Sequence, residues 1–194
     1  MPRKVIHTRT IVVEVFDEGD GTMSIEGRLQ DTQPPESGYH KTGRRPDDPR
    51  PPEVLHGLSA RFRVDRETSE ILKTEGQFPH TPHARCDEVL GWLKRLDGLS
   101  IASGYTGKAR EQLGSPRGCA HMSTLLQVMA NTKTAANAYF MPGTRQERLR
   151  SFKQQLAAKG RIGLTDTRHV WKAGGAAETR VKVEIAEAEA QGII

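Results

Sequence analysis

The segment Gly118-Cys119-Ala120-His121-Met122 brings a thiol and an imidazole within two residues of each other. Ser115-Pro116 stands just before it and is typical of a helix start, so Cys119 is expected near a first helical turn. Exposed amide groups and the helix dipole favour an anionic sulfur there, which makes Cys119 a candidate nucleophile. His121 is the candidate general acid or base, because an imidazole titrates near neutral pH. A buried cysteine followed by a hydrogen-bonded histidine remains the structural alternative.

Three other residues are also candidates for catalysis. His56 follows a proline-rich segment and precedes a strand, His169 lies in the last part of the chain, and Glu26 lies on the polar side of a strand. Each of the two histidines is a catalytic candidate only if folding brings it beside His121. For Glu26 the alternative is cross-strand ion pairing, because arginines occupy the same side of the predicted sheet.

A metal ion is a second interpretation of the same residues. Cys119, His121 and Cys86 could bind one, because thiolate and imidazole are ligands of zinc. The paired Cys-x-x-Cys spacing of zinc sites is absent, however, and Cys86 falls on an apolar helical stripe that is typical of buried cysteine. Motifs for phosphate, for dinucleotides and for a serine nucleophile are absent too. We therefore expect no organic cofactor and leave a metal ion open.

The elements that must position these residues begin with alternating strands. Apolar and polar residues alternate in 8–16 and 23–30 around an Asp/Gly turn, and again in 58–65 and 70–77 around a polar turn. Two such pairs predict two β-hairpins, hence four antiparallel strands with one face covered by helices and one polar face open. The segment 33–53 between the hairpins holds six of the eleven prolines and is predicted to be a loop, either a lid or disordered.

The second half of the chain changes to helical spacing. Helices are predicted at 81–98, around 106–113, from 115 onward and at 144–158, where Thr144 and Glu147 form a capping box. Residues 162–171 are predicted to be extended, and the Ala/Glu-rich tail at 176–194 is predicted to be a frayed or exposed helix. These elements predict an α+β fold with a single domain at 1–175, followed by the tail.

The charge and composition of the chain argue against nucleic-acid binding, a membrane span and a disulfide framework. The net charge is +5, and the window 145–161 alone carries six basic residues against one acidic residue. A solvated helix face explains this window, and no aromatic residues are interleaved with it as in single-strand binders, so nucleic-acid binding is not expected. No apolar run approaches the roughly 18 residues that span a bilayer, and the two cysteines are too few for a disulfide framework. We expect a cytoplasmic protein without a membrane segment.

Several of these segments together resemble a bacterial family of proteins of unknown function, DUF2889. The resemblance is carried by His7-Thr8-Arg9, by 25–32, by the stretch from His56 through Asp65, and by Cys86 followed by Gly118-Cys119-Ala120-His121-Met122. It implies a stand-alone α+β protein from bacteria that degrade aromatic or acyl compounds. Where that family has Gly-Cys-Thr-His-Leu and a closing Cys-His pair, this chain has Ala120, Met122 and Arg168-His169. A site that needs three cysteines would therefore lack one ligand here.

Three function classes follow from these observations. The leading hypothesis is an enzyme acting on a small organic substrate, a lyase or hydrolase without organic cofactor in the catabolism of aromatic compounds. The first alternative is a metal- or sulfur-handling scaffold protein, which the two cysteines and His121 would serve. The second alternative is a basic accessory protein that binds an acidic partner through 145–161. The substrate, the reaction type and the oligomeric state are not predicted.

Overall fold

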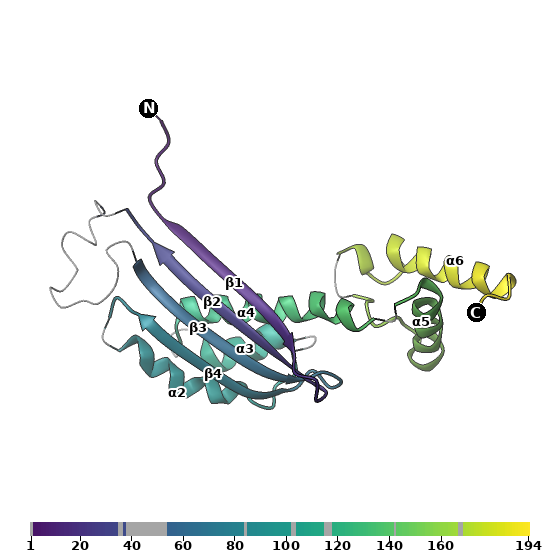
Figure 1. Cartoon of the computed structure of the whole chain (residues 1–194), viewed down its shortest axis with the longest axis horizontal. Coiled ribbons are helices and arrows are strands. Elements are labelled where there is room, and N and C mark those ends of the chain that lie inside the picture. The colour runs from purple at the N-terminus through teal and green to yellow at the C-terminus, as the bar shows by residue number, and fades with distance from the viewer. Residues whose placement is uncertain are drawn as a thin grey trace. The chain divides into compact units, whose positions relative to one another are not determined.

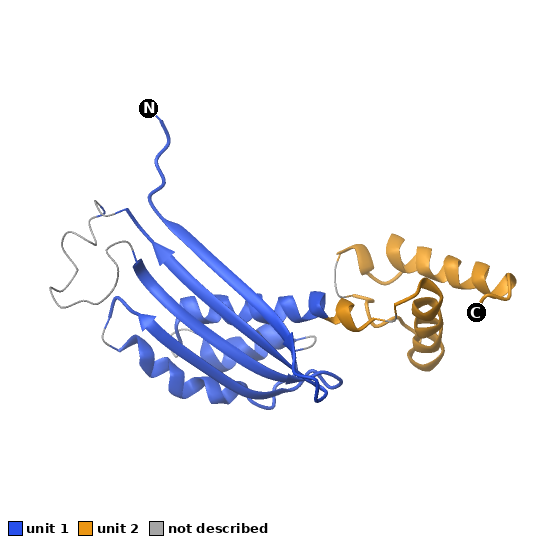
Figure 2. Ribbon diagram, viewed as in Figure 1, with its two compact units in different colours: residues 1–136 blue, residues 137–194 orange. Residues whose placement is uncertain are grey.

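The computed structural model describes residues 2–34, 37, 54–83, 85–101, 104–114, 118–141, 143–166 and 169–194. Most of the predicted proline-rich loop at 33–53 lies outside these residues, as do Ser115, Pro116 and Arg168. The chain forms two compact units, residues 1–136 and residues 137–194 (Figure 2). This boundary differs from the expected one at residue 175.

The first unit is built around a four-stranded antiparallel sheet (Figure 1). Its strands follow the chain order, with each strand paired to the next: β1 (Thr8–Asp17), β2 (Thr22–Thr32), β3 (Val54–Asp65) and β4 (Ile71–His80). The β1–β2 turn contains Gly19 and Gly21, whose φ angles of 77° and 85° are readily adopted only by glycine. The two-hairpin prediction and the α+β class are confirmed.

Helical segments of the first unit cover one face of the sheet (Figure 1). They are the 3-10 helix η1 (Cys86–Val89), α2 (Leu90–Leu93), the 3-10 helix η2 (Lys94–Leu96), α3 (Tyr105–Leu113) and α4 (Ala120–Ala136). The single helix predicted at 81–98 is instead the succession η1–α2–η2. It has no side-chain cap at its start, and Gly91 within it lowers its helix propensity.

Helix α4 packs on the sheet through the apolar stripe expected from the sequence. Its buried residues contact β1, β2 and β3, and they include Met122, Leu125, Leu126 and Met129. The helix lies close to the strands at Gly27, where a Cβ atom would lie 2.7 Å from Met129 Sδ and 2.8 Å from a Leu125 methyl. Gly27 pairs with Ala60 on β3, so two small residues make room for the helix.

The opposite face of the sheet is polar and carries several ion pairs between strands. Arg28 pairs with Glu14, Arg61 with Glu18 and Glu26, and Arg63 with Asp20. This is the cross-strand pairing expected for these residues. Exposed pairs of this kind contribute little stability.

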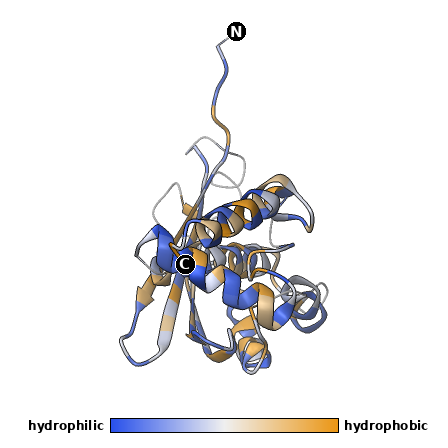
Figure 3. Cartoon of the chain, turned by 90° about the vertical axis from the view of Figure 1, so that its right-hand side faces the viewer, coloured by the Kyte–Doolittle hydropathy of each residue, from blue (hydrophilic) through white to orange (hydrophobic). Residues whose placement is uncertain are grey.

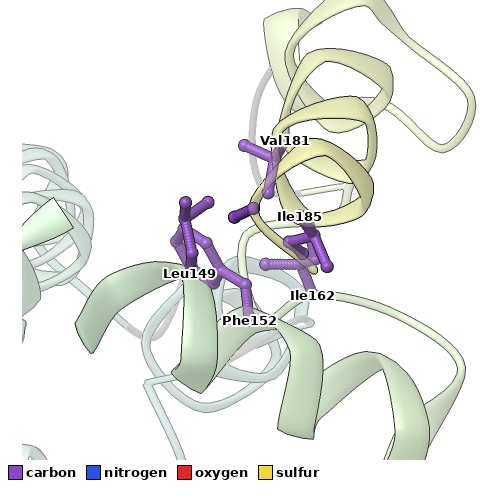
Figure 4. Close-up of a cluster of buried hydrophobic side chains, with 6 residues drawn as sticks. Leu149, Phe152, Ile162, Val181 and Ile185 are labelled. Carbon is purple, nitrogen blue, oxygen red and sulfur yellow. The ribbon is translucent and has the colours of Figure 1, made fainter. Parts of the chain in front are cut away.

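The second unit has a hydrophobic core of its own (Figure 4). It contains the 3-10 helix η3 (Asn137–Phe140), α5 (Arg145–Lys159), the 3-10 helix η4 (His169–Trp171) and α6 (Ala176–Ala190). The capping box of Thr144 and Glu147 is present at the start of α5. The core consists of Leu149, Phe152, Ile162, Val181, Ile185 and Ala188.

Two predictions for this part of the chain are corrected. The tail at 176–194 contributes three residues to that core, because Val181, Ile185 and Ala188 recur at helical spacing on one side of α6. The described part of 162–171 is not extended: it consists of turns and η4, and Asp166 has a φ of 61°. Hydrophobic and hydrophilic residues are interspersed along the helices (Figure 3).

Several basic residues of α5 have partners within their own unit. Arg145 lies 2.8 Å from Glu184, Lys153 lies 2.8 Å from Glu189, and Arg150 donates to the carbonyl of Ile193. Glu184 and Glu189 of α6 therefore neutralise part of the charge of 145–161. None of the described helices combines the length and the apolar character that crossing a bilayer requires.

Candidate functional site

The helix-covered face of the sheet is apolar along most of its length and becomes polar at one end. Leu29 and Leu58 face each other across β2 and β3, and the next inward-facing pair is Asp31 and His56. On β1, Arg9 pairs with Asp31 in the register. Since side chains alternate along a strand, the same periodicity that buries the leucines directs these polar side chains toward the helices.

Asp31 is the centre of this polar end. Its side chain is 0% exposed, and Arg9 donates two hydrogen bonds to its oxygens, at 2.7 and 2.8 Å. Burial by itself raises the pKa of the Asp31 carboxyl, but the hydrogen bonds and charge of Arg9, with smaller contributions from His121 and His56, hold that pKa below its ordinary value. The buried carboxyl group is therefore ionised at neutral pH.

Three imidazoles approach the same carboxylate. His7 Nε2 lies 3.4 Å from one oxygen, while His56 Nδ1 and His121 Nε2 lie 3.2 and 3.3 Å from the other. The rings of His56 and His121 are stacked, with centroids 3.9 Å apart. We call Asp31, Arg9, His7, His56 and His121 the carboxylate cluster.

Both stacked imidazoles are neutral at pH 7. Burial and the neighbouring His121 lower the pKa of His56 to about 4, although Asp31 acts in the opposite direction. Burial also lowers the pKa of His121. A neutral imidazole has a lone pair on one ring nitrogen, which can accept a proton or bind a metal.

Cys119 stands beside this cluster, next to the first residue of α4. Its sulfur lies 3.8 Å from Nδ1 of His121, the ring nitrogen that does not face Asp31. Within a regular helix, residues two apart point to different sides, but Cys119 precedes the helix and so escapes that constraint. The imidazole of His121 thus lies between a thiol and a buried carboxylate.

Gly118 brings the chain into this position. A Cβ atom at residue 118 would lie 1.6 Å from the carbonyl oxygen of Leu113, so only glycine fits there. The close approach joins the end of α3 to the start of α4. A cavity of about 370 Å³ lies at this junction, and its wall includes Arg110, Leu113, Gly118, Cys119, Ser123 and Gln127.

The other predicted site residues lie elsewhere. Glu26 is five residues before Asp31 on β2 and points to the opposite face, where its partner is Arg61 at 3.5 Å. His169 is an exposed residue of η4 in the second unit, whereas the carboxylate cluster belongs to the first unit. The sequence-predicted residues that the structure brings together are His56, Cys119 and His121.

The metal-ligand set differs from the one predicted. Among the residues that the structure describes, the group able to hold an ion is Asp31, His56 and His121, whose ligand atoms all lie within 4.8 Å of one another. Cys86 is not in this group. Burial raises the pKa of the Cys86 thiol, a backbone hydrogen bond at His83 lowers it, and nearby Cys119 raises it further.

Sequence reasoning missed Asp31 and Arg9 as site residues, although a signal was present. The inward-facing positions of β2 run Met23, Ile25, Gly27, Leu29 and then Asp31, and those of β1 run back from Val15, Val13 and Ile11 to Arg9. Extending each alternating pattern by one step past its last apolar residue leads to a charged residue at the covered face. That extension identifies both members of the ion pair.

Comparison with known proteins identifies the family of the chain. No curated protein and no solved structure matches it. A family profile described as "Protein of unknown function (DUF2889)" matches residues 7–135, a range that includes the whole carboxylate cluster and Cys119. The chain therefore belongs to the DUF2889 family.

Proposed function

We propose that this protein is an enzyme that acts on a small organic substrate, with Cys119 as nucleophile, His121 as general base and Asp31 as the group that orients the base. The observation that carries the proposal is the position of His121, with Nδ1 3.8 Å from the sulfur and Nε2 3.3 Å from the carboxylate. A nucleophile, a base and an orienting acid in this order are the parts of a catalytic triad, whatever the fold.

The charges suit each role. A neutral His121 can accept the thiol proton at Nδ1, and the carboxylate favours the tautomer that carries its proton on Nε2. Asp31 remains ionised because the hydrogen bonds and charge of Arg9 keep its pKa low. The Asp31 carboxylate can then stabilise the imidazolium form of His121. The separation of 3.8 Å between sulfur and nitrogen suits a resting state that tightens when substrate binds.

The reaction best suited to these groups is the hydrolysis of an acyl compound. The sulfur of Cys119 attacks the carbonyl carbon, a C–S bond forms, and the leaving group departs with the proton that His121 carries. Water, deprotonated by His121, then attacks the acyl-thioester, which releases the acid and restores the thiol. No organic cofactor takes part in either step.

The start of α4 supplies a place for the developing negative charge. Among the residues that the structure describes, the first hydrogen bond of the helix joins the Ser123 amide to the Cys119 carbonyl, so the amides of residues 120–122 belong to the helix start. Amide groups at a helix start favour an anion, and donors of this kind stabilise the oxyanion of acyl transfer.

The cavity beside Cys119 indicates the kind of substrate. Its volume of about 370 Å³ suits a small molecule, and its wall combines apolar groups such as Leu113 and Leu126 with polar Arg110 and Gln127. We propose a small ester or thioester whose acid part is apolar or aromatic. An aromatic acyl group agrees with what the family resemblance implies.

Site-directed variants test the assignment. A panel of nitrophenyl esters and acyl thioesters is assayed with the native enzyme and with Cys119→Ala, His121→Ala and Asp31→Asn. We expect loss of turnover in the first two, a large decrease in the third, and an acyl adduct on Cys119 by mass spectrometry. Cys86→Ala is the matched control, because it removes the other thiol, and it should retain activity.

Each outcome has a definite meaning. Full turnover in Cys119→Ala would exclude the thiol nucleophile. If His121→Ala were inactive in the same experiment, the result would favour His121 as a general acid or base in a lyase, without a covalent intermediate. Full turnover in His121→Ala would refute the whole assignment.

A further inference from the structure

We infer that Asp31, His56 and His121 form a binding site for a divalent transition-metal ion of the Zn²⁺ class, and that occupation of this site switches off Cys119. The second half of this inference rests on the proposed function. The first half concerns ligand geometry alone and stands without it.

The distances fit a tetrahedral ion. The Asp31 oxygen lies 3.2 Å from His56 Nδ1 and 3.3 Å from His121 Nε2. Zinc bonds of about 2.0–2.1 Å to nitrogen and oxygen give a tetrahedron with edges of roughly 3.3 Å. Two of the three ligand separations therefore match the edges of such a tetrahedron, and all three ligand atoms lie within 4.8 Å of one another.

One of the ligand atoms has few polar contacts. His56 Nδ1 is buried, and apart from its 3.2 Å approach to Asp31 it has no hydrogen-bond partner among the described residues. A buried nitrogen without a hydrogen bond is unfavourable, and an ion would give its lone pair a partner. Two imidazoles and a carboxylate are a donor set that suits zinc, cobalt and nickel.

Arg9 limits the affinity without blocking the site. It donates to both oxygens of Asp31, but a carboxylate oxygen has a second lone pair that can bind a metal. The guanidinium charge next to a dication weakens binding, as does a set of only three protein ligands. We expect weaker binding than at closed structural zinc sites, which have four protein ligands.

Binding of the ion would change the state of His121. An imidazole that binds metal through Nε2 carries its proton on Nδ1, the nitrogen that faces Cys119. It then has no lone pair with which to accept the thiol proton. The same ring therefore cannot serve the ion and the thiol at once, and the metal acts as a reversible inhibitor.

Two variants separate the metal site from the catalytic triad. His56→Gln removes a ligand that the triad does not use, and Cys119→Ala removes the nucleophile that the ion does not use. Co²⁺ is titrated into the metal-free full-length protein and followed by its visible absorption and by calorimetry. We expect one tetrahedral Co²⁺ per chain in the native protein and in Cys119→Ala, and at least tenfold weaker binding in His56→Gln.

The inhibitory effect is measured by thiol alkylation. Zn²⁺ should slow the reaction of Cys119 with iodoacetamide in the native protein and leave the rate in His56→Gln unchanged, with Cys86→Ala as the background in both. Circular dichroism checks that each variant is folded.

The outcomes distinguish this inference from the proposed function. No Co²⁺ binding at 100 μM by the native protein, or a sulfur-to-cobalt absorption band that disappears in Cys119→Ala, would overturn the metal site. Tetrahedral Co²⁺ that depends on His56, together with full turnover by Cys119→Ala, would leave the metal site standing and refute the triad. Binding that does not protect Cys119 would overturn the inhibitory role.

Discussion

Replacing Asp31 by asparagine tests whether the carboxylate cluster holds the polar end of the sheet together. The substitution keeps the shape of the side chain and removes its charge. An amide has one accepting oxygen, and its NH₂ group cannot accept a hydrogen bond. The fork of Arg9, which donates to both oxygens at 2.7 and 2.8 Å, therefore loses one partner and the opposite charge.

The expected loss of stability follows from the burial of the two partners. Removing one member of a buried ion pair costs about 3–5 kcal/mol, because the other charge is left uncompensated. The Arg9 side chain is 36% exposed, so water replaces part of the lost interaction. We expect Asp31→Asn to lower the free energy of unfolding by about 2–3 kcal/mol.

Trp92 in α2 reports on the first unit, and Trp171 belongs to the second unit. Urea unfolding is therefore followed by tryptophan fluorescence in a Trp171→Phe background. Glu26→Gln is the matched control: it makes the same chemical change on the same strand, at an exposed ion pair, and should cost less than about 0.5 kcal/mol.

A double-mutant cycle tests the cause. If the loss comes from an uncompensated guanidinium, Arg9→Gln in the Asp31→Asn background should cost little further stability. A loss below about 0.5 kcal/mol for Asp31→Asn, equal to that of the Glu26 control, would refute the reasoning. So would strictly additive losses in the cycle.

Three other predictions follow from the fold and the cluster. Gly27→Ala should destabilise the first unit by about 1–3 kcal/mol, because its Cβ would lie 2.7 Å from Met129 Sδ. Urea unfolding followed by Trp92 fluorescence measures this loss, and an unchanged urea midpoint would contradict the close packing of α4 on Gly27. The pKa of His56 is about 4 in the folded state and 6.5 for the free imidazole. Between these pH values the unfolded chain therefore binds one more proton than the folded chain. The free energy of unfolding should fall by up to about 3 kcal/mol as the pH drops from 6.5 to 4. That fall should be smaller in His56→Gln, and equal slopes of unfolding free energy against pH would refute the assignment. Ile185→Ala should destabilise the second unit by about 2–4 kcal/mol, measured through Trp171 fluorescence, and should leave the first unit unchanged.

Much of the fold could be predicted because two simple periods describe it. Alternation with period two located both hairpins, and the spacing of Met122, Leu125, Leu126 and Met129 located the buried side of α4. The helix predicted in the tail at 176–194 is present as α6, but its predicted exposure was wrong, because the Ala/Glu-rich composition does not reveal the helical spacing of its apolar residues. The many alanines and glutamates hid a stripe of Val181, Ile185 and Ala188 that packs into a core.

The site could be predicted only in part. The Cys119–His121 pair was visible because its members are close in the sequence. Asp31 and His56 are far apart in the chain, and only the strand register brings them side by side. Periodicity could direct both to the covered face, but it could not show that the start of α4 lies over them, since a helix can shift along a sheet without changing its own pattern.

The carboxylate cluster draws its members from the starts of β1 and β3, the end of β2 and the first turn of α4. No fragment of the first unit that lacks one of these elements can assemble it, so it exists only in the folded state. Any ligand that binds there is therefore coupled to folding: at one hundred times its dissociation constant it raises the unfolding free energy by about 2.7 kcal/mol. The melting temperature of the chain thus reports occupancy, and a thermal-shift screen can search for the natural ligand before the reaction itself has been identified.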